Sequence, residues 1–399
     1  MTLDVARIRS DFPALGSGIA YFDGPGGSQV PRQVAEAVAR TMTSGISNRG
    51  RVTAAERLAD DVTTGARQAV ADLLGCDPGG VVFARSMTQA TYDVSRALAK
   101  EWAEGDEVVV TRLDHDANIR PWVQAAEAAG ATVRWVGFDR ETAELTVDDV
   151  REQLSGKTKL VAVTAASNVL GTRPDLPAIA EAVHEVGALL YVDGVHLTPH
   201  VPVDVAAFGA DFFACSPYKF LGPHHGIVVA APELLERIHP DKLLPATDDV
   251  PERFELGTLP YELLAGTTAA VDYLAGLASD AADRRTRVLE SMRAVEEHEE
   301  RLFARLLDGL RGIPGVQLHG DAKRRTPTAF FSVVGREDQE VYEELAARGV
   351  NAPASSFYAI EASRWLGLGD TGAVRAGLAP YSSADDVERL LAGVAEIAG

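Results

Sequence analysis

Two stretches decide the fold of this 399-residue chain: LLYVDGVH at 189–196 and DFFACSPYKFLGP at 211–223. Each starts as an apolar, β-prone run and ends at a polar residue near glycine or proline, which is typical of a buried strand followed by a loop. Asp193 closes the first run, and Lys219 follows the second. Because ligands of open α/β sheets bind outside the carboxyl ends of the strands, we expect both side chains to face one site.

The sequence around these stretches repeats the same design from about residue 80 to residue 230. Short β-rich runs alternate with helical stretches whose apolar periodicity is clear at 90–101, 121–129 and 176–186. This alternation indicates an α/β domain with a mainly parallel sheet. We expect seven strands, at 81–83, 107–111, 132–136, 160–164, 189–192, 212–215 and 226–230.

The length of the chain favours two domains, because single cores stop growing beyond roughly 250–300 residues. Past residue 266 the pattern changes to long helices, two short strand-like runs and a closing helix, at 265–279, 287–309, 316–318, 329–334 and 383–397. We therefore expect a large α/β domain over 17–265 and a smaller α+β domain made of 1–16 and 266–399.

Composition excludes several classes of function. A formal net charge of −20 disfavours nucleic acid, because phosphate recognition depends on clustered Lys and Arg. Long charge-free apolar runs and a signal-like N-terminus are both missing, so we expect a cytoplasmic protein without a membrane span. Cys76 and Cys215 have no metal-ligand spacing, and no second cluster completes a shell with Asp114, His115 and Asp116, so no metal is expected.

Asp193 and Lys219 are the two groups that pyridoxal 5'-phosphate (PLP) needs. A lysine amine forms a Schiff base with the cofactor, and a buried carboxylate keeps the pyridine nitrogen protonated so that the ring accepts electrons. A strand-capping Asp and an exposed loop Lys are equally common, however. The pair alone leaves both interpretations open.

A phosphate site is expected where the strand at 81–83 turns into a helix, within ARSMTQAT. A helix N-terminus there offers free N–H groups and a positive dipole end, and the hydroxyls of Thr88 and Ser216 add donors. Plain helix capping by Ser86 or Thr88 is the competing interpretation. GPGG at 24–27 lacks the context of a nucleotide-binding loop and is interpreted as a tight turn that brings backbone close to a ligand.

Several motifs, taken together and in order over nearly the whole chain, resemble class V, fold-type I PLP enzymes, and specifically their cysteine desulfurase and selenocysteine lyase branch. The resemblance implies the PLP-dependent transferase fold, PLP as cofactor, a small amino-acid substrate and a homodimer with shared active sites. The motifs are YFDGPGGSQVP, SMTQAT, LDHDANIRPW, ASNVLGT, YVDGVH, CSPYKFLGPHHG, FELGT and VRAGLAPYSSADDVERLL.

The same resemblance implies a role for each site residue. Lys219 is the Schiff-base lysine and proton shuttle, Asp193 pairs with the pyridine nitrogen, and His115 stacks on the ring. Asn168 and Arg375 hold the substrate carboxylate, a task that suits a bidentate guanidinium. The remaining expected cofactor contacts are Ser86, Met87, Thr88, Ser216, His196 at the phenolic oxygen, and Thr258 reaching the phosphate across the dimer interface.

One departure from the family pattern concerns the substrate loop. Desulfurases carry a nucleophilic Cys shortly before the Arg, and here GVNAPASSFYAIEASRWLG at 349–367 contains none. We therefore expect a C–S lyase that carries out β-elimination on a cysteine-like or cystine-like amino acid. Amino-acid epimerisation or transamination is the alternative, and a degenerate PLP-binding scaffold is the non-enzymatic one. Phe357, Tyr358 and Trp365 suggest an apolar or aromatic lining for the side-chain pocket.

Overall fold

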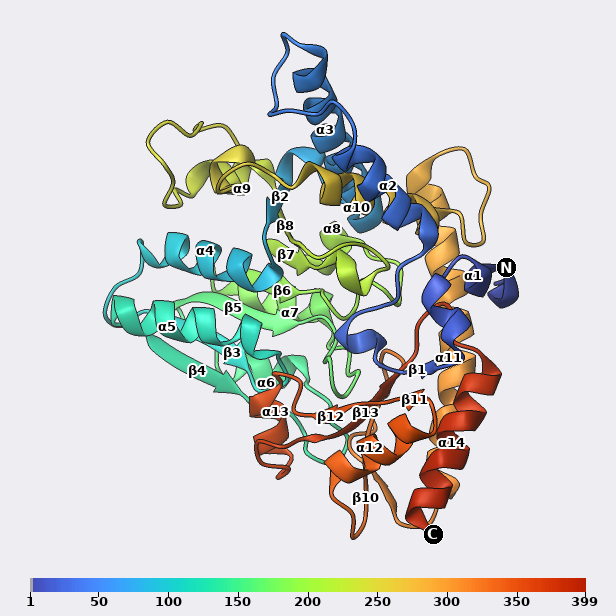
Figure 1. Ribbon diagram of the computed structural model, residues 1–399. Coiled ribbons are helices and arrows are strands. Elements are labelled where there is room, and N and C mark those ends of the chain that lie inside the picture. The colour runs from blue at the N-terminus through green and yellow to red at the C-terminus, as the bar shows by residue number, and fades with distance from the viewer. Residues whose placement is uncertain (1–2) are drawn as a thin grey trace.

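The computed structural model describes residues 3–399 and is built around a seven-stranded sheet (Figure 1). The strand order is β2-β8-β7-β6-β5-β3-β4; β8 runs antiparallel to both its neighbours, and all other pairs are parallel. The fold class expected from the sequence is confirmed. The strands are β2 (Val81–Ala84), β3 (Glu107–Thr111), β4 (Thr132–Val136), β5 (Thr158–Thr164), β6 (Leu189–Asp193), β7 (Phe212–Cys215) and β8 (Gly226–Ala230).

Helices cover both faces of this sheet, which explains why its inner strands are apolar throughout. One face packs against α4 (Met87–Ala99) and α5 (Arg120–Ala129), whose Trp122 is fully buried. The other face packs against α3 (Ala54–Leu74), α7 (Leu176–Glu185) and α10 (Tyr261–Ala275). Edge strand β4 differs: its side chains alternate in exposure, as expected of a strand that meets solvent.

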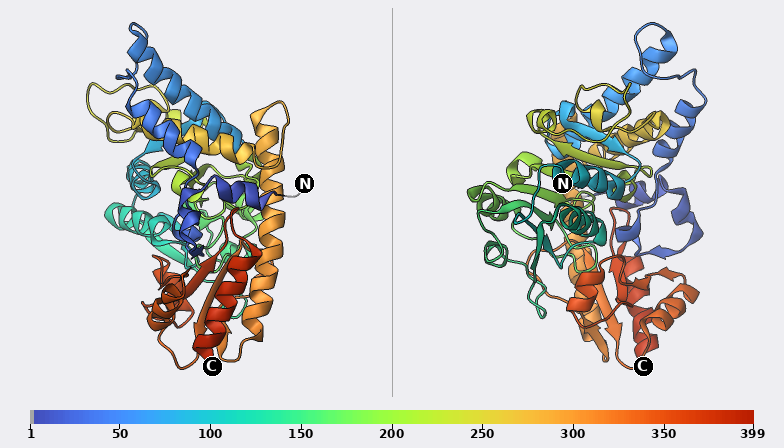
Figure 2. Two further views of the ribbon diagram at one scale, coloured as in Figure 1. Left: turned by 45° about the vertical axis from the view of Figure 1, so that its right-hand side comes forward. Right: turned by 90° about the vertical axis from the view of Figure 1, so that its left-hand side faces the viewer.

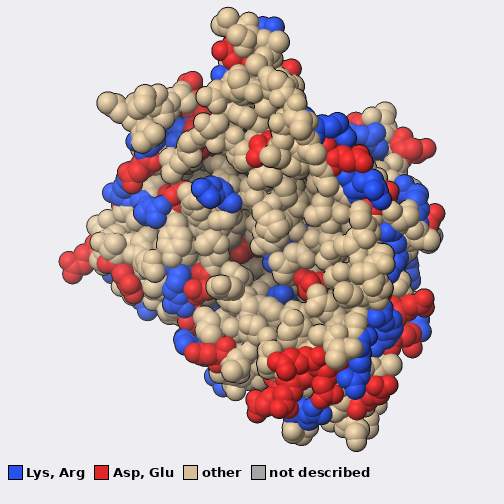
Figure 3. Space-filling view, in the orientation of Figure 1, with Lys and Arg blue, Asp and Glu red and all other residues tan. Residues whose placement is uncertain are grey.

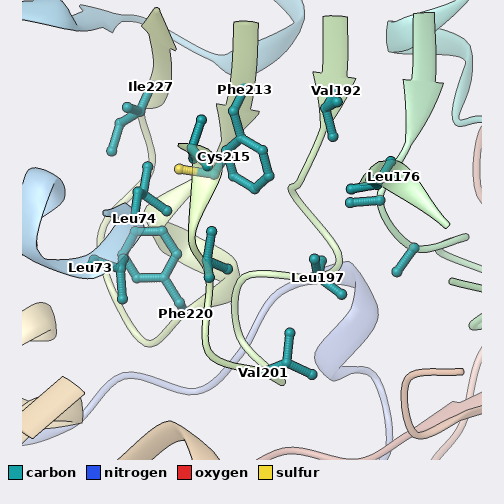
Figure 4. Close-up of a cluster of buried hydrophobic side chains, with 14 of the residues drawn as sticks. Leu73, Leu74, Leu176, Val192, Leu197, Val201, Phe213, Cys215, Phe220 and Ile227 are labelled. Atoms are coloured by element: carbon teal, nitrogen blue, oxygen red, sulfur yellow. The ribbon is translucent and has the colours of Figure 1, made fainter. Parts of the chain in front are cut away.

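The core under the second face is continuous from α3 to the strand ends. Figure 4 shows Leu73 and Leu74 of α3 together with Phe213 and Cys215 of β7 and with Phe220. Each fully buried side chain of this size contributes roughly 1.5–3 kcal/mol through the hydrophobic effect. This packing holds the ends of β6 and β7, and with them Asp193 and the loop of Lys219.

The C-terminal part forms a second layer below the large sheet (Figures 1 and 2). A four-stranded antiparallel sheet has the order β12-β13-β10-β9, and β1 (Ala20–Tyr21) pairs with β11 (Val350–Asn351). The other strands are β9 (Val316–Leu318), β10 (Thr328–Val333), β12 (Ala354–Ser355) and β13 (Ala373–Gly377); α12 (Asp338–Ala347), α13 (Ile360–Trp365) and α14 (Ala384–Ala398) accompany them.

The helix α11 (Arg284–Gly312) connects the two layers. Its first half places Val288 and Met292 in the core of the large sheet, and its second half places Leu306 and Leu310 in the core of the small sheet. The division of the chain at 16/17 and 265/266 stays a prediction. The remaining helices are α1 (Val5–Ser10), α2 (Arg32–Met42), α6 (Val147–Arg151), α8 (Val205–Phe208) and α9 (Pro232–Arg237), with short 3₁₀ turns between elements.

Candidate active site

A buried pocket lies at the carboxyl ends of β2, β6 and β7, where the sequence predicts the site. It opens into a cleft of about 1000 Å³ that reaches the small sheet, and the space-filling view shows a hollow near the middle of this face (Figure 3). Arg375, Phe357 and Tyr358 line the cleft. The pocket is lined by the predicted Ser86, Met87, Thr88, His115, Asn168, Asp193, His196, Ser216 and Lys219, together with Tyr218.

Lys219 stands in a 3₁₀ turn (Pro217–Lys219) directly after β7, and its side chain is buried. Its Nζ donates a hydrogen bond to the carbonyl oxygen of Pro25, in the GPGG turn. Burial disfavours the ammonium form and lowers the pKa of Lys219 to about 7; the charge of Arg375 adds to this effect and Asp193 opposes it. The amine is therefore largely neutral, and hence nucleophilic, slightly above neutral pH.

Asp193 is the last residue of β6 and faces the same pocket. Its Oδ1 accepts a hydrogen bond of 2.9 Å from the backbone N–H of Val195. Burial raises the pKa of Asp193 to about 6, against the opposing effects of that bond and of Lys219. The next residue must be small, because a Cβ on Gly194 would lie 1.8 Å from the ring of Phe213. A buried carboxylate of this kind is stabilised by a cationic or N–H partner.

The start of α4 forms one end of the pocket, where Ser86, Met87 and Thr88 line it. Ser86 caps the helix, and its side chain accepts a hydrogen bond of 3.1 Å from the N–H of Gln89. Strand β8 passes immediately behind this turn, since a Cβ on Gly226 would lie 2.1 Å from the carbonyl carbon of Ser86. Helix capping by Ser86 is therefore observed, and Ser86 also lines the pocket with Thr88; the phosphate site stays a prediction.

His115 lies at the pocket mouth with its tautomer set by the backbone. Its Nδ1 accepts a hydrogen bond of 3.0 Å from the N–H of Ala117, so the neutral ring carries its proton on Nε2. Burial and the nearby charges of Lys219 and Arg375 lower the pKa of His115 to about 3. The ring is thus neutral at physiological pH, as suits an aromatic stacking partner.

His196 lies on the far side of the pocket, within a buried polar chain. Its Nε2 is 2.9 Å from the hydroxyl of Thr328, its ring meets His200 edge to face, and His200 Nδ1 is 2.8 Å from Glu299. Burial lowers the pKa of His196 well below its ordinary value. Its Nδ1 is buried without a hydrogen-bond partner among residues 3–399, and the residue lines the pocket, so this atom is available for a hydrogen bond.

Arg375 also has a buried N–H group without a hydrogen-bond partner among the described residues. It lies on β13, is 2% exposed, and donates from Nη1 to the backbone oxygen of Asn168 at 3.0 Å, while its Nε has no partner within the described chain. Burial lowers the pKa of Arg375 to about 9, and the charge of Asp23 opposes the shift. A buried guanidinium with N–H groups to spare is suited to a carboxylate. Asn168 uses one amide N–H on the carbonyl of Phe357, at 3.0 Å, and has a second N–H left.

Two residues predicted at the site, Thr258 and Trp365, lie outside both the pocket and the cleft, and so does Asn118, which follows β3. Thr258 is exposed in the segment after the 3₁₀ turn Glu252–Phe254, and it lines neither the pocket nor the cleft. Asn118 is buried and ties Asp114 to the indole of Trp122. Trp365 lines a separate groove, where its Nε1 donates to the backbone oxygen of Phe138 at 2.8 Å.

Comparisons with known proteins agree with this geometry. The model of the class V aminotransferase family matches residues 20–390. The chain belongs to this family. An uncharacterized protein, MT3887, of Mycobacterium tuberculosis (strain CDC 1551 / Oshkosh) is 36% identical to this class V chain over 100% of both sequences. A probable cysteine desulfurase 2 of Mycobacterium leprae is 32% identical, over 98% of this chain and 96% of its own.

A solved structure shows the same likeness in three dimensions. The cysteine desulfurase CsdA from Escherichia coli superposes with a TM-score of 0.87 and 26% identity, covering 99% of this chain and 98% of its own. Class V aminotransferases are PLP-dependent enzymes, so the expectation of a PLP-dependent enzyme of the desulfurase-like branch is confirmed at the level of the family. Which reaction this class V enzyme carries out is a separate question.

The residues present fit PLP on the evidence of the site itself. A buried lysine amine, a buried carboxylate and a helix N-terminus converge on one pocket, and the unpartnered His196 Nδ1, Asn168 Oδ1 and Arg375 Nε lie around it. Asp23 was not predicted from the sequence. It accepts a hydrogen bond of 2.6 Å from Asn351, and its charge raises the pKa of Arg375. Its signal was its place in YFDGPGG, where only a turn was inferred.

Proposed function

We propose that this chain is a PLP-dependent C–S lyase that carries out β-elimination on a cysteine-like or cystine-like amino acid. The sulfur leaves as sulfide, as a thiol or, from a disulfide substrate, as a hydropersulfide, and the remaining enamine takes up water to give an α-keto acid and ammonia. The observation that carries the proposal is the combination of one pocket that holds Lys219 and Asp193 with a cleft wall that holds Arg375 and contains no thiol. PLP, when bound, supplies an electron sink for the bonds at the substrate's α-carbon.

The chain's own residues would divide the remaining work. Arg375 and Asn168 bind the substrate carboxylate and thereby orient the α-carbon toward Lys219. Lys219 Nζ takes the α-proton, and its low pKa matches that task near neutral pH. Asp193 holds a proton on the pyridine nitrogen, His115 and His196 contact the ring and its oxygen, and Ser86, Met87, Thr88 and Ser216 hold the phosphate.

Persulfide chemistry lacks a suitable nucleophile in this proposal. The reactive form of cysteine is the thiolate. Burial, together with Asp77, raises the pKa of Cys76 to about 12, and burial raises that of Cys215 further. Neither side chain lines the pocket or the cleft, and Cys215 lies in the core that Figure 4 shows. Sulfur would therefore leave as a free product.

A homodimer with shared sites is part of the same proposal. Large apolar side chains are exposed near the end of α2, the start of α3 and the segment of Thr258: Met42, Val52, Leu58 and Leu256. The segment is held in place, because Glu252 and Glu255 pair with Arg49 and Arg67. Thr258 is thus presented on a fixed, exposed loop. No helix among residues 3–399 is long and apolar enough to cross a membrane, and a cytoplasmic location remains an expectation.

The activity is tested with purified, PLP-loaded protein and a panel of cysteine, cystine, S-alkylcysteines, alanine and other amino acids. Keto acid and a sulfur product in equal amounts are expected from the sulfur amino acids only: sulfide from cysteine, a thiol from S-alkylcysteines and a hydropersulfide from cystine. Loss of optical activity without keto acid would identify an epimerase, and keto acid formed only with an amino acceptor would identify an aminotransferase. A protein that stays colourless with added PLP would support the scaffold.

Shared sites are tested by mixing two inactive variants, Lys219→Ala and Thr258→Asp, under conditions that exchange subunits. In a mixed dimer one site combines the native Lys219 of one subunit with the native Thr258 of the other, so activity is expected to return. Recovery from Thr258→Asp homodimers alone, or none from the mixture despite proven exchange, would argue against a contribution across the interface.

A further inference from the structure

The segment that faces Arg375 has an unusual backbone. Phe357 and Tyr358 both adopt the left-handed conformation, with φ of 50° and 59°. This region costs a non-glycine residue roughly 1–2 kcal/mol, and such strain persists only where surrounding contacts hold it. Two successive aromatic residues therefore need contacts that compensate for their backbone conformation. Both line the cleft, and Phe357 also packs against the core of the large sheet.

Phe357 belongs to a closed set of contacts around the guanidinium of Arg375. Its ring centroid lies 3.6 Å from the guanidinium carbon. Its carbonyl accepts from Asn168 Nδ2 at 3.0 Å, and the Asn168 carbonyl accepts from Arg375 Nη1, also at 3.0 Å. An aromatic ring stacked on one face of a guanidinium leaves its edge free. Phe357 thereby sets the plane in which a carboxylate meets Arg375.

Tyr358 makes the corresponding contacts on the other side of the cleft. Its carbonyl accepts from the N–H of Asp116 at 2.7 Å, and its ring stacks on His115, with centroids 5.5 Å apart and an angle of 27°. The side chain is nevertheless 75% exposed. Because so little of this ring is buried, its contribution to the core is small, and its main contact is the imidazole beneath it.

We propose that Phe357 and Tyr358 together form a positioning clamp, in which Phe357 orients Arg375 toward the substrate carboxylate and Tyr358 orients His115 toward the cofactor ring. This inference rests on the proposed function, since it assigns substrate and cofactor to these two neighbours. It also explains the use of this loop in a chain without a loop cysteine: the loop holds two binding residues and delivers no nucleophile.

The two residues of the clamp should affect different constants. Phe357→Leu should change the KM of the substrate and Tyr358→Leu the Kd of PLP, so the two variants are compared. Loss of a guanidinium–aromatic contact should raise the KM of an amino-acid substrate about tenfold, with kcat and the PLP Kd within about twofold of wild type. Loss of the Tyr358–His115 stack should raise the PLP Kd about two- to tenfold and alter its visible absorption, with little change in KM. Phe357→Tyr keeps the stacked ring and should restore the wild-type KM.

Controls separate the clamp from general destabilisation. Tyr342→Leu on α12 removes a half-buried aromatic residue that lines neither the pocket nor the cleft, and it should change neither constant. Equal changes of KM and PLP Kd in both clamp variants, or no change in either, would overturn the proposal.

A third measurement is independent of the reaction. Amide hydrogen exchange at Asp116 is followed in the apoprotein, where the N–H donates to the carbonyl of Tyr358. Tyr358→Leu should accelerate this exchange and Tyr342→Leu should not. If wild-type protein binds PLP but no amino acid reacts or changes its spectrum, the proposed reaction fails, while exchange and the PLP Kd still decide the clamp. Unchanged exchange and an unchanged PLP Kd would then reject it.

Discussion

The two walls of the cleft are built on different principles. On one wall, Asp193 ends β6, and Ser216 and Lys219 follow the neighbouring β7. Ser86 stands at the adjoining helix start. On the other, Arg375 rises from the small sheet, and side-chain contacts to Phe357 and to the backbone of Asn168 hold it. The first wall, which is the proposed cofactor wall, is therefore set by backbone geometry. The second, which is the proposed substrate wall, is set by side-chain packing across the chain.

This difference indicates where a class V enzyme can change its reaction. A change on the cofactor wall disturbs strand ends whose positions depend on the whole sheet, such as Gly194, where a Cβ would collide with Phe213. A change in residues 355–358 alters the contacts of Arg375 and leaves those strands in place. The substrate wall is thus the part that can diverge in substrate and reaction while PLP chemistry is kept.

The largest expected effect comes from the cofactor wall. Lys219→Ala should remove the visible absorption of protein-bound PLP and lower turnover by about 10²–10⁴-fold or more, because both the covalent anchor and the proton-transfer group are lost. Lys242→Ala is the matched control, since Lys242 pairs with Asp248 away from the cleft. An unchanged spectrum in Lys219→Ala would show that another lysine anchors the cofactor.

A substitution in the substrate wall should have a smaller effect, limited to substrate binding. Arg375→Lys keeps the charge but loses the planar pair of N–H donors, so the KM for amino acids should rise about 10- to 100-fold. The PLP absorption should stay intact, and Arg311→Lys, an exposed pair with Asp321, should behave as wild type. If Arg375→Lys lost PLP and substrate binding together, the two walls would not be separable.

The third prediction concerns the pH dependence of PLP capture by Lys219. It joins the two walls, because the charge of Arg375 helps to lower the pKa of Lys219. Only the neutral amine reacts with the PLP aldehyde. With a pKa of about 7, the rate of PLP capture by the apoprotein should level off above about pH 8 and fall about tenfold per unit below about pH 6.

The shifted pKa of Lys219 also predicts how the stability of the apoprotein changes with pH. Between about pH 7 and pH 10.5, the unfolded lysine binds a proton that the folded one does not, so the unfolding free energy of the apoprotein should rise with pH over this window through this group. A capture rate that stays constant down to pH 5, or one with a midpoint near 10, would contradict the assigned environment of Lys219.

The cofactor wall was predictable from sequence because its residues follow apolar runs at short range. The strand expected at 212–215 is β7, and the strand expected at 189–192 is β6 to within one residue. Because β6 and β7 end at the same edge of the sheet, Asp193 and Lys219 could be expected to lie near each other. Asn118 shows the limit of the same rule: it also follows a strand, yet it turns into the protein to hold Asp114 and Trp122. Strand position predicts a neighbourhood and leaves side-chain direction open.

Fold class, strand ends and family motifs can be read from the sequence alone, because periodicity and turn residues act over a few neighbouring positions. Three features are visible only in the folded molecule: Phe357 covers the guanidinium of Arg375, the charge of Asp23 raises the pKa of that guanidinium, and Trp365 lines another groove. These contacts join residues that are far apart along the chain or in strained backbone. Their energies depend on distance and burial in the folded molecule, and no local pattern of residues encodes either quantity.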